Sequence, residues 1–208
     1  MKRNVWIAIF LLHICLALCP LAVSGKDQRN VSVSYDGHWW LLAPNNEQYG
    51  FLNGFFDCYF YEYRGSAHFS YSVDVYQLDI TKYFQGNVSD LNEPILRVLL
   101  QFHDPRGFKI IDPYAEPANG QRGGKDGLYW MQISANSGPQ LEQRGFIEGY
   151  LECHVRLNHN KGGAFSRPPA EYVSLITQWY GFKRDTDDVD LVRQPTAIAN
   201  VLFKFQDK

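Results

Sequence analysis

Two glutamates at matching positions are the side chains best suited to acid–base chemistry. Residues 44–58 read PNNEQYGFLNGFFDC and residues 139–153 read PQLEQRGFIEGYLEC, so Glu47 and Glu142 occupy the same place in two similar segments, 95 residues apart (139 − 44). A carboxylate pair across the axis that relates the segments would suit a hydrolytic enzyme. The alternative, which we favour, is that each glutamate compensates the dipole of a helix, because both lie in a predicted first turn.

The cysteines that end these segments point to a disulfide rather than to a nucleophile. His154 follows Cys153, and a thiol nucleophile needs a histidine base. Adjacent helical residues point about 100° apart, however, and the equivalent of His154 is Tyr59. Cys58 and Cys153 are the only cysteines outside the N-terminal apolar run, and an even pair in an oxidising compartment is expected to bond. We therefore predict one intramolecular bridge between them.

Four aromatic residues stand in a motif, Asp-Gly-x-aromatic-Trp, that precedes both segments at residues 36–40 and 126–130. Paired rings of this kind suit stacking on sugars or clamping a peptide. The alternative, which we favour, is burial in the core, with Asp-Gly making the preceding turn. The four aromatic residues are Trp39, Trp40, Tyr129 and Trp130.

Neither the histidines nor the acidic run at residues 185–190 forms a recognisable metal site. His38, His68, His103 and His159 have no metal-ligand spacing, and the acidic run lacks the glycine that an EF-hand loop needs at its sixth position. No metal and no cofactor are therefore predicted.

The matching segments belong to a longer internal repeat, which predicts a fold. Each segment reads as a helix, and two further amphipathic patterns follow it in each copy. In the first copy the residues predicted to face the core are Tyr76, Ile80 and Tyr83 on one helix and Ile95, Val98, Leu99 and Phe102 on the next. In the second copy they are Tyr172, Ile176 and Trp179 on one helix and Ile198, Val201, Leu202 and Phe205 on the next. The sequence thus predicts an all-α protein, a tandem duplication of a three-helix unit with pseudo-two-fold symmetry.

Glycines recur on one stripe of the first helix of each unit, at Gly50 and Gly54 and at Gly145 and Gly149. Glycine inside a helix costs about 0.5 to 1 kcal/mol relative to alanine, so a close backbone approach is the expected reason for keeping it. We predict that the two helices cross glycine face to glycine face. The alternative is that each stripe packs within its own repeat. Asp57 and Glu152 lie off the stripe and are expected to be solvated.

The N-terminus has the three-part form of a secretory signal at residues 1–25, with Lys2 and Arg3 before an apolar run and small residues after it. An uncleaved membrane anchor is the alternative. Repeat 1 is expected at residues 26–104, a Gly/Pro-rich linker at 105–125 and repeat 2 at 126–208, with no later membrane span.

Without the signal the formal net charge of the protein is −4 (18 − 22), which speaks against nucleic-acid binding. The expected location is secreted or periplasmic.

The Gly-Phe-x-x-Gly and Gly-Phe-x-x-Gly-Tyr patterns at residues 50–54 and 145–150, with the helices that follow, resemble small secreted helical proteins of a Gly-Tyr-x-x-Gly type. These include periplasmic immunity proteins that protect bacteria from type VI secretion effectors. The chain is also similar to uncharacterised bacterial secreted proteins. The resemblance implies effector neutralisation, and no site residue is carried over from it. The expected function is non-enzymatic binding of another protein; the alternatives are a cell-wall hydrolase with paired carboxylates and a structural or chaperone-like envelope protein.

Overall fold

The part of the chain that the structure describes is built from helices. The computed structural model describes residues 35–62, 69, 71–102, 124–136, 140–158, 164–181, 190 and 192–207. These residues contain no β-strand, only isolated bridges between Asp36 and Pro94 and between Asp126 and Ala197. The predicted all-α fold is thereby confirmed. The predictions for the signal segment, for linker residues 105–123, for Pro139 and for most of the acidic run concern residues outside these ranges.

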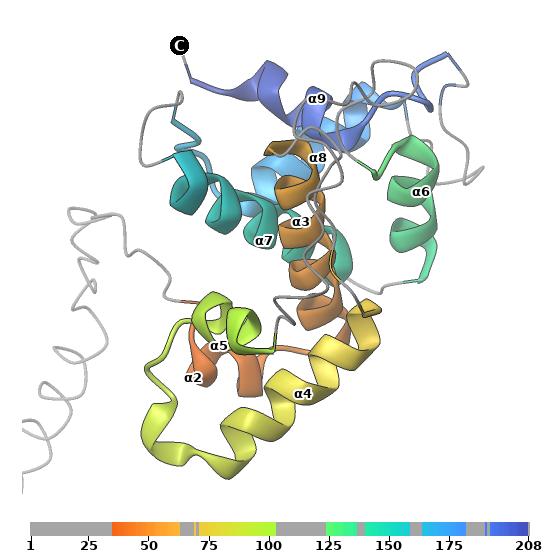
Figure 1. Ribbon diagram of the computed structural model, residues 1–208. Helices are drawn as coiled ribbons and strands as arrows, with labels where there is room; N and C mark the ends of the chain where they lie inside the picture. The colour runs from red at the N-terminus through yellow and green to blue at the C-terminus, as the bar shows by residue number, and fades with distance from the viewer. Residues whose placement is uncertain are drawn as a thin grey trace, which may run out of the picture. The chain divides into compact units, whose positions relative to one another are not determined.

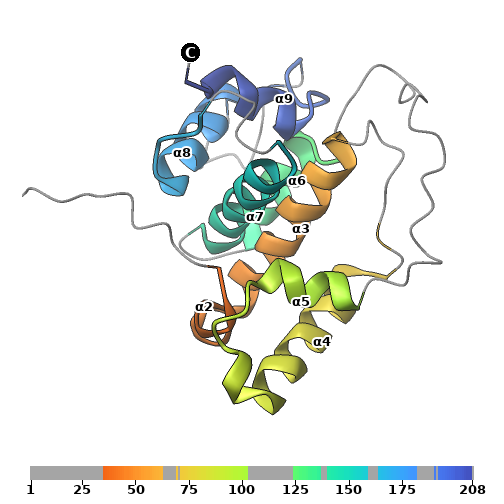
Figure 2. The same cartoon turned by 60° about the vertical axis from the view of Figure 1, so that its left-hand side comes forward.

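The helices follow one another in the same order in two parts of the chain. The first part has α2 (Gly37–Leu42), α3 (Asn45–Glu62), α4 (Val73–Gly86), the 3-10 turn η1 (Val88–Asp90) and α5 (Ile95–Gln101). The second part has α6 (Gly127–Asn136), α7 (Leu141–Asn158), α8 (Pro169–Trp179), α9 (Ile198–Leu202) and the 3-10 turn η3 (Phe203–Phe205). In Figures 1 and 2, α2, α4 and α5 lie on one side of the α3–α7 pair, and α8 and α9 lie on the other. Across the described residues, no helix is both long and apolar enough to span a bilayer.

The Asp-Gly pairs begin short helices instead of making turns. Asp36 is the N-cap of α2, and its Oδ1 accepts a hydrogen bond from the backbone N of Trp39 at 3.1 Å. Asp126 Oδ1 likewise accepts from the backbone N of Tyr129 at 3.1 Å. Aspartate suits this place because its side chain satisfies an N–H group that has no partner within the helix. The prediction of a turn before the aromatic residues was therefore wrong, and each part has a short helix that the pattern did not reveal.

Helices α3 and α7 touch backbone to backbone at their glycines. A Cβ atom built on Gly54 would lie 1.9 Å from the carbonyl oxygen of Phe146, and one built on Gly149 would lie 1.9 Å from that of Phe51. Real Cβ contacts are never so short, so both positions accept glycine only. Close packing of the helices is thus the structural reason for keeping glycine inside them.

The other two glycines repeat this contact one turn earlier. A Cβ atom on Gly50 would lie 2.1 Å from the carbonyl oxygen of Glu142, and one on Gly145 would lie 2.1 Å from that of Glu47. Between the earlier and the later contact, both chains advance by four residues in the same direction. The two helices therefore run in the same direction where they cross. Helix α3 begins at Asn45, one residue later than predicted, and the carbonyl of Pro44 accepts the first hydrogen bonds.

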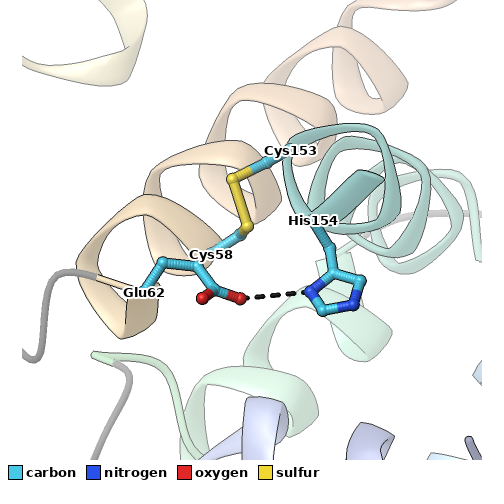
Figure 3. Close-up of a disulfide and its surroundings, with 4 residues drawn as sticks. All are labelled: Cys58, Glu62, Cys153 and His154. Carbon is cyan, nitrogen blue, oxygen red and sulfur yellow. Dashed lines mark hydrogen bonds and ion pairs between the residues drawn. A yellow bond between two sulfur atoms is a disulfide. The ribbon is translucent and has the colours of Figure 1, made fainter. Parts of the chain in front are cut away.

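A disulfide joins the same two helices beyond the glycines. Cys58 of α3 and Cys153 of α7 are bonded, with their Cα atoms 6.2 Å apart, and both residues are fully buried (Figure 3). The Cα distance falls within the roughly 4.4 to 6.8 Å that disulfides tolerate. The predicted bridge is confirmed.

Helices α4 and α8 turn a slightly different side to the core than the predicted one. The buried positions are spaced i, i+4, i+8, whereas the prediction ended each stripe at i+7. Tyr83 and Trp179 are half-buried, and the Tyr83 hydroxyl donates to Asp90 Oδ2 at 2.7 Å. Both spacings keep residues near one helical face, so the neighbouring helices decide between them. The residues buried are Tyr76, Ile80 and Phe84 in α4 and Tyr172, Ile176 and Tyr180 in or directly after α8.

Replacing Gly54 by alanine should strongly destabilise the protein. The new methyl group cannot fit beside the carbonyl of Phe146 unless α3 and α7 move apart, so we expect the free energy of unfolding to fall by about 3 kcal/mol or more. Gly86→Ala is the matched control, because a Cβ there meets nothing within 4 Å, and it should change stability by less than about 1 kcal/mol. Urea denaturation measures both. Equal losses would contradict the close contact.

Non-reducing peptide mapping should recover the α3 and α7 peptides linked through Cys58 and Cys153. Reduction is expected to lower the free energy of unfolding by about 4 to 5 kcal/mol, because the bridge closes a loop of about 95 residues in the unfolded chain. Two free thiols, or a bridge formed only between chains, would show that the two helices do not meet in solution as they do here.

Candidate functional site

The tryptophans of the repeated motif serve the core. Trp40 and Trp130 are fully buried. The indole Nε1 of Trp40 donates to Thr81 Oγ1 at 2.9 Å, and that of Trp130 donates to Thr177 Oγ1 at 3.0 Å. A buried indole needs such an acceptor, and each one here is supplied by the helix that follows α3 or α7. The remaining two rings of the motif, Trp39 and Tyr129, are half-buried and pack against the core. Core packing is therefore the role the structure gives these residues.

Glu47 has a different partner from the hypothesised Glu142. Glu47 is only 2% exposed, and its Oε1 accepts a hydrogen bond from Arg144 Nε at 2.7 Å and a second from Arg144 Nη2. Glu142 is half-buried; burial raises its pKa, and the charge of Lys125 opposes that effect. The hypothesis of a Glu47–Glu142 carboxylate pair is thus replaced by an ion pair between α3 and α7. Both glutamates do lie in first turns, as expected.

Glu148 is a buried carboxylate that the sequence analysis missed. It is 9% exposed and lies one helical turn from Arg144, whose Nε is 3.7 Å from Glu148 Oε1. Burial and, to a lesser degree, the nearby charge of Glu47 raise the pKa of Glu148 to about 7. Its equivalent in the first segment is Asn53, so comparison of the repeats gave no signal for it.

Asp57 is also buried, contrary to the expectation that it is solvated. It is 3% exposed, and its Oδ1 accepts hydrogen bonds from the backbone N atoms of Gly124 and Lys125 at 2.7 and 2.9 Å. Burial raises its pKa to about 7, although the two hydrogen bonds oppose the shift. Its equivalent, Glu152, is partly exposed and pairs with Arg156 at 2.7 Å. No periodic pattern could reveal that residues 124 and 125 return to α3.

A small aromatic pocket opens beside Asp57. Its volume is about 220 Å³. The Phe56 and Phe69 rings are stacked with centroids 4.1 Å apart, so each ring holds the other in place in the pocket wall. The Nζ atom of Lys125 lies 4.4 Å from the centre of the Tyr129 ring, a cation–π contact that holds the ammonium group at that ring. The described lining residues are Phe56, Asp57, Phe60, Phe69, Tyr71, Gly124 and Lys125.

An exposed apolar surface continues from this pocket along α4. Tyr71 lines the pocket, lies two residues before the start of α4 and is 52% exposed. Val75 and Leu78 are 40% and 53% exposed and lie three residues apart, hence on one side of α4. We call these three residues the α4 face. It is distinct from the buried stripe of the same helix.

His154 and the disulfide form a buried, packed group (Figure 3). His154 Nδ1 lies 3.1 Å from Glu62 Oε1, and its ring packs edge-on against Phe165 and Phe203. The sulfur of Cys153 is bonded to Cys58, so it cannot serve as a nucleophile with His154 as base. Within the described ranges, no group of His, Cys, Asp and Glu side chains is arranged to hold a metal ion.

The stability of the protein should fall as the pH rises from about 4 to about 7. In the unfolded chain Asp57 and Glu148 ionise near pH 4, whereas in the folded protein both stay protonated to about pH 7. Each group then lowers the free energy of unfolding by at most about 1.4 kcal/mol per pH unit over that range. Asp57→Asn keeps an oxygen for the two N–H groups and should make the profile flatter.

Denaturant midpoints measured across this pH range test the expectation. Glu148→Gln should reduce the slope in the same way, and the double variant should reduce it further. A profile for Asp57→Asn that parallels the unmodified protein would contradict the burial of this carboxyl group.

Comparison with known proteins adds no further information about the site. No protein-family model matches the chain, and no match is found among curated proteins or solved structures. The candidate functional site is accordingly defined by its own geometry: the aromatic pocket beside Asp57 and the α4 face, which share Tyr71.

Proposed function

We propose that the protein is an exported binding protein that engages another protein through the α4 face. The observation that carries the proposal is that three exposed apolar residues begin at an aromatic pocket: Tyr71 lines the pocket, and Val75 and Leu78 follow it on α4. Isolated apolar residues on a surface are ordinary, but apolar residues gathered beside a pocket are typical of interaction sites. Aromatic rings within such a site supply much of the binding energy in protein complexes.

The equivalent part of α8 supports this interpretation. The buried stripes of α4 and α8 correspond at an offset of 96 residues, as in Tyr76 and Tyr172. At the same offset the α4 face corresponds to polar residues in the second unit, namely Arg167, Glu171 and Ser174. Arg167 and Glu171 form an ion pair there, at 3.0 Å. The fold therefore does not require apolar residues at these positions, which supports a binding role for those on α4.

The proposal includes an origin by tandem duplication. It is supported by features that occur at equivalent places in both units: the reciprocal glycine contacts, the Trp–Thr hydrogen bonds and the bridges that join α2 to α5 and α6 to α9. A unit that cannot bury its apolar face alone is completed by a second copy. Once the shared core exists, the outer surface of either copy is free to diverge.

Export is supported by the signal-like N-terminus and by the buried Cys58–Cys153 bridge, a bond that persists in oxidising compartments. Neutralising a secreted effector, which the resemblance noted above implies, is one form of the proposed binding. In that case the partner would be the effector itself, held through the α4 face.

Site-specific photo-cross-linking tests the proposal. A photoreactive amino acid is placed at Leu78, or at Ser174 as the matched control, and the protein is expressed in its native host. We expect Leu78 to yield a discrete cross-linked species that Val75→Glu abolishes, because a charge there removes the apolar contact. Ser174 should yield none. Identical patterns at the two positions would contradict a binding role for the α4 face.

A further inference from the structure

We infer that the partner presents an amphipathic helix whose apolar side chains are flanked by lysine or arginine, and that one of the apolar side chains enters the pocket beside Asp57. This inference rests on the proposed binding role of the α4 face. The geometry of α4, the charges beside its apolar residues and the lining of the pocket support it.

The shape of the α4 face favours a helical partner. Val75 and Leu78 form a narrow ridge on a straight run of helix, Val73–Gly86. Ridges of this kind pack into the grooves of another helix, and amphipathic helices are a common means of recognising apolar surfaces. Tyr71 extends the ridge toward the pocket at the N-terminal end of α4.

Aspartates border the ridge on both sides. Asp74 lies four residues before Leu78, and Asp79 lies four residues after Val75, so each carboxylate stands beside one of the apolar residues. Asp74 is exposed and Asp79 is half-buried. Lys82 is the cation on this side of α4, at the end farther from the pocket. A partner with basic residues on either side of its apolar stripe complements this arrangement.

The pocket is sized and lined for one side chain. At about 220 Å³ it is smaller than the roughly 300 to 1,000 Å³ typical of small-molecule sites. Its walls are aromatic, and Asp57 is among its lining residues. Asp57 stays protonated to about pH 7 and the Lys125 ammonium also lines the pocket, so these two groups do not attract a second cation. With Lys125 Nζ held over the Tyr129 ring, an incoming apolar side chain meets the aromatic walls.

Charge argues against two other occupants of the α4 face. A second copy of this chain would bring both aspartates of each copy to one interface, and Lys82, the one cation within α4, offsets half of that charge. A membrane with anionic lipids would repel the same aspartates. Like charges brought together across an interface oppose association.

Defined peptides test the inference. The probe is an 18-residue peptide of leucine and lysine in helical periodicity, compared with a leucine–glutamate and a serine–lysine peptide of the same pattern. Fluorescence anisotropy should show that the leucine–lysine peptide binds about tenfold or more tighter than either of the other two. Leu78→Ser should weaken it about tenfold, whereas Ser174→Ala on α8 should leave it unchanged. Asp74→Asn with Asp79→Asn should weaken binding and reduce its dependence on salt.

Four outcomes would overturn the inference. The first two are equal binding of the leucine–lysine and leucine–glutamate peptides, and no effect of the aspartate substitutions. The third is binding to phosphatidylcholine or phosphatidylglycerol vesicles that Leu78→Ser abolishes. The fourth is self-association in sedimentation experiments that the same substitution abolishes. If no peptide binds while Leu78 still cross-links to a protein, the inference fails and the proposed function stands. All variants are compared by thermal melting, so that loss of binding is separated from loss of fold.

Discussion

Main-chain contact between α3 and α7 is the constraint on which the rest of the structure depends. Carbonyl oxygens of one helix lie where the Cβ atoms of the other would be, so the spacing of the helices is set by glycine and tolerates no larger residue. That spacing brings Cys58 and Cys153 within bonding distance. It also gives the core aromatic residues of both units, such as Phe51 and Phe146, a common place to pack.

Close packing of these helices also buries charge. Glu47 is held by Arg144 across the helix pair. Asp57 accepts hydrogen bonds at one oxygen, and Glu148 Oε1 lies 3.7 Å from Arg144 Nε; in the described structure the second carboxyl oxygen of each is buried without a hydrogen-bond partner. Burial of this kind costs free energy, which the carboxyl groups reduce by staying protonated to about pH 7. The protein therefore retains, in its interior, two groups that titrate near pH 7.

The two units share an interior and differ at the surface. Tyr76 and Tyr172 are buried alike, and the tryptophan hydrogen bonds are the same in both. On the outer side, α4 carries Val75 and Leu78 where α8 carries polar residues. Because the buried positions are alike in the two parts of the chain, differences on the outside report what each surface does and not how the fold is held.

The sequence alone determined the helical class, the disulfide and the packing role of the glycines, because each depends on residue type and spacing within one segment and on the match between two segments. Tertiary structure alone decided that Arg144 is the partner of Glu47, that Asp57 binds residues 124 and 125, and that α4 buries Phe84 in place of Tyr83. Helical periodicity tells which residues share a face, but it does not tell which distant segment covers that face. Burial, ion pairing and the exposure of the α4 face all depend on that covering segment.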